Sequence, residues 1–148
     1  MANGTVLVRG ARALGTEPTD LLLRDGVIAE RGAGLSAAGA RVVEADGLVA
    51  LPGLVDLHTH LREPGREDAE TVDSGTRAAA LGGYTAVHAM ANTEPVADTA
   101  GVVEQVWRLG ERAGGAQVRP VGAVTVGLRG EWLAELGAMA ESAPAVRV

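Results

Sequence analysis

The chain contains 148 residues, of which 47% are hydrophobic, and carries a formal net charge of −6. This length and composition indicate one ordinary globular domain, and the acidic balance argues against a nucleic-acid partner, whose backbone attracts clustered positive charge. All 13 basic residues are arginine and cysteine is absent, which excludes a carboxylated lysine, a Schiff base, disulfides and thiolate ligands within the chain.

Residues 1–51 show the pattern of a small β subdomain. A hairpin is predicted over residues 21–29, because Asp25-Gly26 between apolar runs is typical of a tight hairpin turn. Further short strands are predicted over residues 5–9, 41–44 and 48–51. These pieces are too short to enclose a large core by themselves.

From residue 52 to residue 148, predicted strands alternate with predicted helices. The strands are expected over residues 54–59, 84–90, 117–126 and 146–148, and the helices over residues 68–81, 98–113 and 131–142. Such alternation predicts an α/β fold with a parallel sheet. A closed (β/α)8 barrel needs about 250 residues. We therefore expect the first part of a TIM-like barrel, truncated at the start of strand 4, in a fragment of a longer protein; a complete, doubly wound domain is the alternative.

Several side chains define these helices. Asp68 is the expected N-cap of the first helix, and Gly82-Gly83 is expected to end it. In the second helix, Val102, Val103, Val106 and Gly110 share one face. Trp107 and Trp132 are expected to pack within the helical layer.

Two histidines stand at the end of the apolar strand 54–59. Side chains alternate faces along a strand, so His58 and His60 are expected to point the same way. Two imidazoles a few ångströms apart on a rigid strand can hold one divalent metal ion. A lone His-x-His is a weak signal, and buried, hydrogen-bonded histidines are the alternative.

Arg62 and Asn92 suggest a site for an anion beside this pair. Function in parallel α/β folds collects at the carboxyl ends of the strands. Arg62 follows the first of these strands and Asn92 follows the second. A guanidinium fork and a carboxamide together suit one carboxylate.

Residues 52–65, with the sequence Pro-Gly-Leu-Val-Asp-Leu-His-Thr-His-Leu-Arg-Glu-Pro-Gly, resemble the metal-site signature of dihydroorotases, which belong to the amidohydrolase superfamily. Residues 75–85 and 90–93 resemble the next blocks of that family in the right order. Ala91 is a departure, since the family commonly has proline there. The resemblance covers essentially the whole chain and implies that residues 1–51 are part of the β subdomain that flanks the barrel.

The resemblance implies a hydrolase that interconverts (S)-dihydroorotate and N-carbamoyl-L-aspartate in pyrimidine biosynthesis. His58 and His60 would bind zinc, of which the full-length protein would hold one or two ions. Arg62 and Asn92, with His60 beside them, would hold the substrate carboxylate. The catalytic aspartate and the remaining ligands come from later strands of the family's barrel, so no catalytic residue is expected in this fragment, which alone should be inactive.

Two other functions remain open at this level. A hydantoinase, dihydropyrimidinase or allantoinase would share the histidine pair, although an uncharged ring does not need the carboxylate clamp of Arg62. A non-catalytic dihydroorotase-like scaffold for aspartate carbamoyltransferase is the second alternative. Association with that enzyme, or a homodimer, is the expected assembly.

No apolar run approaches the ~20 residues of a membrane span, and no signal peptide is evident, so we expect a cytoplasmic protein without a membrane partner. Asp56 and His88 stay open. Asp56 has the parity of His58 and is either support for a ligand or a satisfied strand acid; His88 is more typical of a core or supporting histidine than of a ligand.

Overall fold

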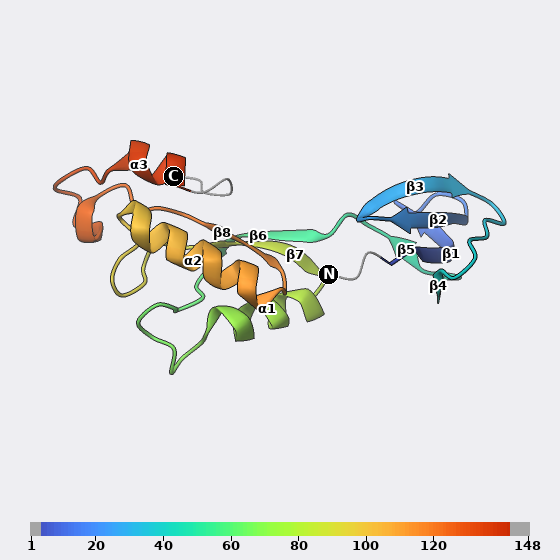
Figure 1. Ribbon diagram of the computed structural model, residues 1–148, viewed down its shortest axis with the longest axis horizontal. Helices are drawn as coiled ribbons and strands as arrows, with labels where there is room; N and C mark the ends of the chain where they lie inside the picture. The colour runs from blue at the N-terminus through green and yellow to red at the C-terminus, as the bar shows by residue number, and fades with distance from the viewer. Residues whose placement is uncertain (1–3, 143–148) are drawn as a thin grey trace. The chain divides into compact units, whose positions relative to one another are not determined.

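The computed structural model of the protein describes residues 4–142 (Figure 1). The chain divides after Pro52 into two compact units, Met1–Pro52 and Gly53–Val148. None of the described helices combines the length and the apolar character that spanning a membrane requires.

The first unit is a five-stranded β sheet in the order β3-β2-β1-β4, with β5 paired to the end of β1. The pairs β1–β2 and β2–β3 are antiparallel, whereas β4 and β5 run parallel to β1. The strands are β1 (Val6–Ala13), β2 (Thr19–Arg24), β3 (Val27–Gly32), β4 (Arg41–Glu44) and β5 (Val49–Ala50).

The predicted hairpin is confirmed, because Asp25 and Gly26 both adopt positive φ, at 51° and 80°, in the turn between β2 and β3. Strand β1 continues beyond the predicted end at residue 9. Gly10 lies in the middle of β1 with φ of 74°, at a shift in the register with β2. A glycine that the sequence presents as a strand end therefore forms a bulge.

The core of the first unit is small, as expected, and includes a charged residue. Asp20 is only 5% exposed, and its carboxylate accepts the N–H groups of Gly10 and Leu35, each at 2.9 Å. These bonds, chiefly the one from Gly10, hold the pKa of the Asp20 carboxyl below its usual value. The buried apolar side chains around it are those of Leu7, Ala11, Leu21, Leu22 and Ala45.

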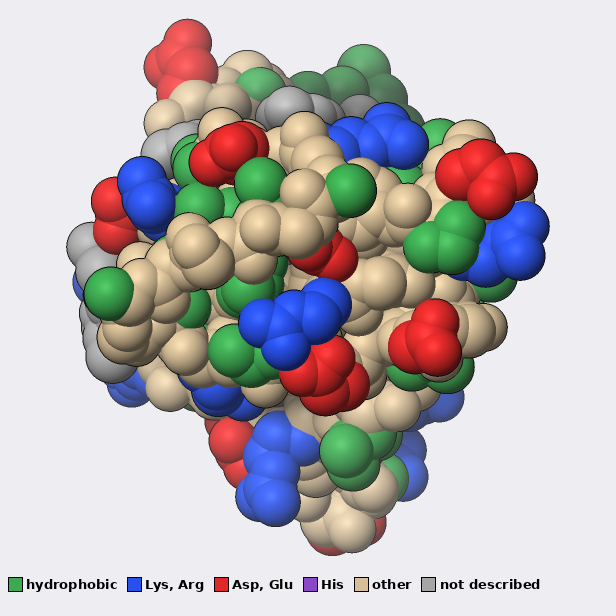
Figure 2. Space-filling model, turned by 90° about the vertical axis from the view of Figure 1, so that its right-hand side faces the viewer, with side chains coloured by type: hydrophobic (Ala, Val, Ile, Leu, Met, Phe, Trp, Pro, Cys, Tyr) green, Lys and Arg blue, Asp and Glu red, His purple; other side chains and the backbone are tan. Residues whose placement is uncertain are grey.

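The exposed surface mixes charge and apolar groups. On the face in view, Figure 2 shows arginine and acidic side chains interspersed with apolar ones, and no basic patch gathers there. Arg9 and Glu44 form an ion pair of this kind, at 2.8 Å.

The second unit has the expected α/β architecture, with three parallel strands in the order β6-β7-β8. The helix α1 packs on β7 and α2 packs on β8, and the two helices contact one another (Figure 1). The elements are β6 (Leu54–Thr59), α1 (Val72–Leu81), β7 (Tyr84–Ala89), α2 (Ala100–Ala113), β8 (Gln117–Pro120), the short 3-10 turn η1 (Val126–Leu128) and α3 (Leu136–Ser142).

The helices cover the sheet through two apolar clusters. The predicted face of α2 is confirmed, because Val103, Val106 and Gly110 are buried. A Cβ at Gly110 would lie 2.5 Å from the Cβ of Val118, so the absent side chain lets α2 approach β8. The cluster around β7 and β8 contains Leu61, Val72, Val87, Ala89, Val106, Ala116 and Val118, and the cluster beneath α3 contains Ala91, Ala97, Val103, Ala123, Ala134 and Met139.

The start predicted for α1 is wrong. The N-cap is Thr71 rather than Asp68, because the Thr71 hydroxyl accepts the N–H of Ser74 and the Ser74 hydroxyl accepts the N–H of Thr71. The N–H of Val72 is taken by a carboxylate oxygen of Glu63 at 2.7 Å. These bonds satisfy the helix end and leave residues 66–70 in turns.

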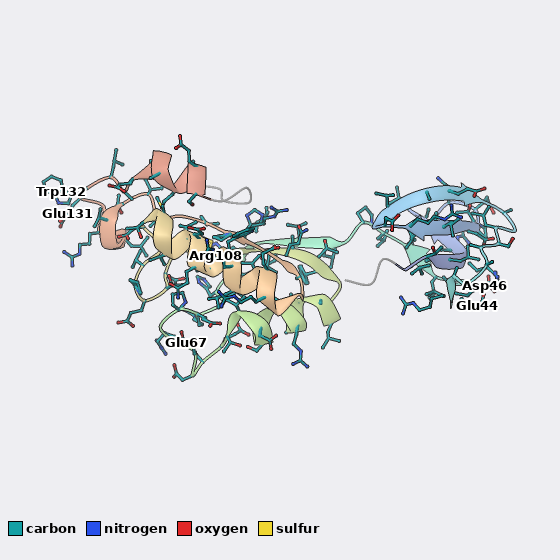
Figure 3. All side chains as sticks on the ribbon, viewed as in Figure 1. Glu44, Asp46, Glu67, Arg108, Glu131 and Trp132 are labelled. Carbon is teal, nitrogen blue, oxygen red and sulfur yellow. The ribbon has the colours of Figure 1, made fainter. Side chains whose placement is uncertain are left out.

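The segment after β8 also differs from the prediction. The strand ends at Pro120 rather than residue 126, and α3 begins at Leu136 rather than residue 131. Between them the chain forms its own turn, in which Val126 bonds to Trp132 and Ala134 bonds to Val124. Trp132 is 72% exposed at this turn (Figure 3), so its predicted packing in a helix is wrong, whereas Trp107 packs on the cluster beneath α3. The strand predicted over residues 146–148 lies outside the described residues.

Candidate metal and substrate site

The predicted site residues gather where β6 and β7 end. His58 is in β6, His60 follows it directly, and Asn92 follows β7. They line one hollow of about 430 Å³, together with Met90, Ala91, Val121, Gly122, Ala123, Val124, Thr125 and Leu128. A pocket at the carboxyl ends of parallel strands is the usual place for chemistry in α/β folds.

The two histidine rings lie side by side, as the strand pattern predicted. Their centroids are 5.0 Å apart and their planes meet at 69°. His58 is exposed and His60 is half-buried, so solvent and small molecules can reach both rings. This geometry fits two ligands of one divalent ion.

The side chain of Asn92 forms a hydrogen bond with the ring of His60. Its carboxamide oxygen Oδ1 lies 2.8 Å from Nδ1 of His60. A carboxamide oxygen only accepts, so this contact favours the tautomer of the neutral ring in which Nδ1 carries the proton and Nε2 has the lone pair. Metal-binding histidines commonly donate their other ring N–H to such an acceptor.

Asp56 contacts the backbone of the histidine pair rather than its rings. Its Oδ1 accepts the N–H of His58 at 3.0 Å. This bond is the main reason that the pKa of the Asp56 carboxyl is lowered, and the nearby rings of His58 and His88 act in the same direction. His88, in β7, pairs with Arg119 of β8. Its side chain is half-buried and does not line the hollow.

Arg62 is the predicted residue that the structure does not bring into the hollow. Its backbone has φ of 63°, its side chain is half-buried, and it is not part of the lining. Within residues 4–142 its guanidinium takes part in none of the ion pairs. His58, His60 and Asn92 therefore line the hollow together, whereas Arg62 lies in the loop that follows β6.

The loops that carry Arg62 and Asn92 are tied together. The N–H of Glu94 donates to the carbonyl of Pro64 at 2.9 Å. Gly65, with φ of 104°, lies so close that a Cβ there would overlap the carbonyl oxygen of Glu94. Glu63 anchors the first loop to the N-terminus of α1. No spacing rule connects Glu63 to a helix N-terminus nine residues later, so sequence reasoning could not assign this contact.

The far wall of the hollow was also missed, because residues 121–125 were predicted to continue a strand. The N–H of Val121 still donates to the carbonyl of Ala89 and extends the β7–β8 ladder by one bond, whereas the N–H of Ala123 donates to the carbonyl of Ala97, each at 2.8 Å. The bond from Ala123 ties this segment to the loop that follows β7, and residues 121–125 line the hollow.

The histidine pair fits part of a zinc site. Catalytic zinc usually has three protein ligands and one open position. Among the residues that the structure describes, no group of three or more histidine, cysteine or acidic side chains could hold a metal ion. His58 and His60 could thus supply two of the ligands that such a site needs.

Comparison with known sequences agrees with these features. A family model described as dihydro-orotase-like matches residues 47–146. A dihydroorotase from Streptomyces coelicolor is 70% identical over 142 residues, which are 96% of this chain and 33% of that protein. Dihydroorotases from Leifsonia xyli and Mycobacterium tuberculosis are 69% and 56% identical, over 100% and 97% of this chain and 34% of each relative. The chain thus spans about a third of the length of these relatives.

Solved structures with similar folds are larger hydrolases. The L-hydantoinase (dihydropyrimidinase) of Arthrobacter aurescens matches with a TM-score of 0.65 at 25% identity, over 81% of this chain and 28% of its own. N-isopropylammelide isopropylaminohydrolase of Burkholderia multivorans matches with a TM-score of 0.63 at 25% identity, over 86% of this chain and 40% of its own. The predicted fold, an incomplete TIM-like barrel preceded by a small β subdomain, is confirmed.

Proposed function

Because the chain belongs to the dihydro-orotase-like family, we propose that it is the N-terminal part of a zinc-dependent dihydroorotase, which interconverts (S)-dihydroorotate and N-carbamoyl-L-aspartate. The observation that carries the proposal is the hollow in which His58, His60 and Asn92 meet at the carboxyl ends of β6 and β7. The high identity to proteins named dihydroorotase supports this activity over that of a hydantoinase.

His58 and His60 hold the zinc in this proposal. The ion, when bound, acts as a Lewis acid that polarises the carbonyl of the cyclic amide. Oδ1 of Asn92 accepts the Nδ1–H of His60, which favours the neutral tautomer whose Nε2 lone pair can bind the metal, so the ligand needs no tautomer change. The strand β6 fixes the spacing of both rings.

Asn92 and Arg62 recognise the carboxylate of the substrate. Oδ1 of Asn92 contacts His60, and its Nδ2 has no hydrogen-bond partner within residues 4–142, so Nδ2 can donate to the carboxylate of the substrate. The guanidinium of Arg62 forms no ion pair within residues 4–142. It turns toward the same carboxylate when the substrate binds. Two such donors orient the ring for attack.

The general base, an aspartate, and the remaining zinc ligands belong to the two thirds of the relatives' length that this chain does not cover. We accordingly expect the chain alone to bind zinc weakly and to hydrolyse no substrate. Stoichiometric zinc binding at micromolar or lower concentration, together with turnover, would contradict this expectation. The small-molecule substrate, a cytoplasmic location, and assembly as a homodimer or with aspartate carbamoyltransferase are parts of the same proposal.

The test uses the full-length gene product that contains this chain. We expect it to purify with zinc and to hydrolyse dihydroorotate, while dihydrouracil and hydantoin, which lack the carboxylate, react poorly. Removal of a charge-assisted hydrogen bond costs about 1.5–3 kcal/mol, so Arg62→Met should lower kcat/KM for dihydroorotate by about 10- to 100-fold and leave the zinc content unchanged.

Two results would overturn the proposal. Equal or better turnover of dihydrouracil would assign the protein to the hydantoinase and dihydropyrimidinase group. A protein without zinc and without turnover that co-purifies with aspartate carbamoyltransferase would identify a scaffold.

A further inference from the structure

The strand β6 contains one extra residue at the first histidine of the pair. Asp56 pairs with Val87 and Thr59 pairs with Ala89, so three steps along β6 match two steps along β7. The extra residue is a bulge between Asp56 and Thr59, and it includes His58.

Asp56 supplies the hydrogen-bond acceptor that this bulge requires. A bulged residue leaves the ladder, and an unpaired backbone N–H costs free energy comparable to a lost hydrogen bond. The N–H of His58 donates to Oδ1 of Asp56 at 3.0 Å. Pairing with β7 then resumes, because the N–H of Met90 donates to the carbonyl of Thr59 at 2.9 Å.

The bulge controls where the two imidazoles point. Shifting a strand by one residue turns its side chains to the opposite face, and a bulge places such a shift at one position. Plain alternation places His58 and His60 on the same face, but a bulge formed between the two histidines would turn their rings to opposite faces, so the separation of 5.0 Å depends on the extra residue being held at His58.

We propose that Asp56 is a positioning residue for the metal site, which holds the bulge of β6 through the N–H of His58 and so keeps the ring of His58 beside that of His60. The role of the two rings as zinc ligands is taken from the proposed function. Asp56 itself touches neither ring in this role, and its carboxylate works as a hydrogen-bond acceptor.

The test separates this acceptor from the negative charge that Asp56 also places near His58 and His88. Asp56→Asn keeps an oxygen acceptor and removes the charge, whereas Asp56→Glu keeps the charge and moves the acceptor by one methylene. Asp56→Ala removes both. Asp73→Ala is the matched control, because Asp73 is an exposed acid on α1 that, within the described part of the chain, forms an ion pair only with Arg77, at 3.8 Å.

Zinc affinity of the full-length protein is measured by competition with a chromophoric chelator. Loss of a partner that orients a ligand typically costs 10- to 100-fold in metal affinity. We expect Asp56→Ala and Asp56→Glu to weaken zinc binding by about 10-fold or more, and Asp56→Asn and the control to stay within about 3-fold of the wild type. If Asp56→Ala does not fold, the zinc affinities of Asp56→Asn and Asp56→Glu alone distinguish the role of the acceptor from that of the charge.

Crystal structures of the zinc-free variants give the second readout. We expect the two rings to stay near their wild-type separation in Asp56→Asn and to move apart in Asp56→Glu. Wild-type affinity in Asp56→Glu with weak binding in Asp56→Asn would overturn the inference in favour of charge. A wild-type protein that binds no zinc would instead overturn the proposed function, whereas unchanged ring positions in every variant would refute the positioning role alone.

Discussion

The carboxamide oxygen of Asn92 lies 2.8 Å from Nδ1 of His60, which links the loop after β7 to the end of β6. The contact favours the His60 tautomer that has its proton on Nδ1, and it comes from the loop after the neighbouring strand. It also orients Asn92, whose Nδ2 then faces away from the ring. In the proposed function, this one amide orients a zinc ligand and also binds the carboxylate of the substrate.

The first prediction concerns this amide. In the full-length protein, Asn92→Ala should weaken zinc binding by about 10- to 100-fold and also raise KM for dihydroorotate, because ligand orientation and carboxylate binding are lost together. Chelator competition and steady-state kinetics measure the two effects. Gln105→Ala, which removes an exposed amide from α2, is the control. A raised KM with unchanged zinc affinity would limit Asn92 to substrate binding.

The second prediction concerns the contact between the loops. Gly65 needs both its φ of 104° and its lack of a side chain, because a Cβ would overlap Glu94. Gly65→Ala should lower the free energy of unfolding by about 1–3 kcal/mol and raise KM, since the loops carrying Arg62 and Asn92 must separate. Urea unfolding and kinetics test this.

The matched control is Gly101→Ala in the first turn of α2, where a Cβ meets nothing within 4 Å. There the same substitution should stabilise the protein by about 0.5–1 kcal/mol, because alanine loses less backbone entropy than glycine. Equal effects of the two substitutions would show that the approach of Gly65 to Glu94 is unimportant.

Elements with a purely local signal could be predicted from the sequence. The apolar run of β6 fits both predicted ends, Leu54 and Thr59, and the Asp25-Gly26 turn is typical of its hairpin. The bulge within β6 could not be predicted, because it depends on the pairing with β7. The adjacent rings of His58 and His60 were still anticipated correctly.

The N-terminus of α1 shows how a distant contact selects between two local signals. Asp68 and Thr71 are both good N-cap residues by type. The capping box of Thr71 with Ser74, and the carboxylate of Glu63 on the N–H of Val72, favour the later start. The segment that forms the far wall of the hollow likewise depends on a distant contact, the bond from the N–H of Ala123 to the carbonyl of Ala97.

The third prediction tests whether Thr71 or Asp68 is the N-cap of α1. Thr71→Ala should lower the free energy of unfolding by about 1 kcal/mol, because the helix loses its capping hydroxyl. Asp68→Ala should change it by less than about 0.5 kcal/mol, since Asp68 is exposed and its nearest ion-pair partner, Arg66, is 3.8 Å away. Urea unfolding of both variants measures the two losses of stability. A larger loss in Asp68→Ala than in Thr71→Ala would identify Asp68 as the N-cap.

The fourth prediction concerns acid stability in the first unit. The folded pKa of Asp20 is lowered mainly by the N–H of Gly10, with a further bond from Leu35. A folded pKa below the unfolded value means that the ionised carboxylate stabilises the fold above about pH 3.9, and that this contribution is lost as the pH falls through the folded pKa. Stability should therefore decline on acidification below that pH.

Asp20→Asn removes the ionisation and keeps one oxygen acceptor, so its free energy of unfolding should change less between about pH 5 and about pH 2 than that of the wild type. Urea unfolding followed by circular dichroism at each pH gives the comparison. Asp25→Asn is the control, because this exposed turn residue has a positive φ that asparagine tolerates. If Asp20→Asn and Asp25→Asn lose stability with acid as steeply as the wild type does, then other groups govern the acid response and the two backbone bonds of Asp20 contribute little to it.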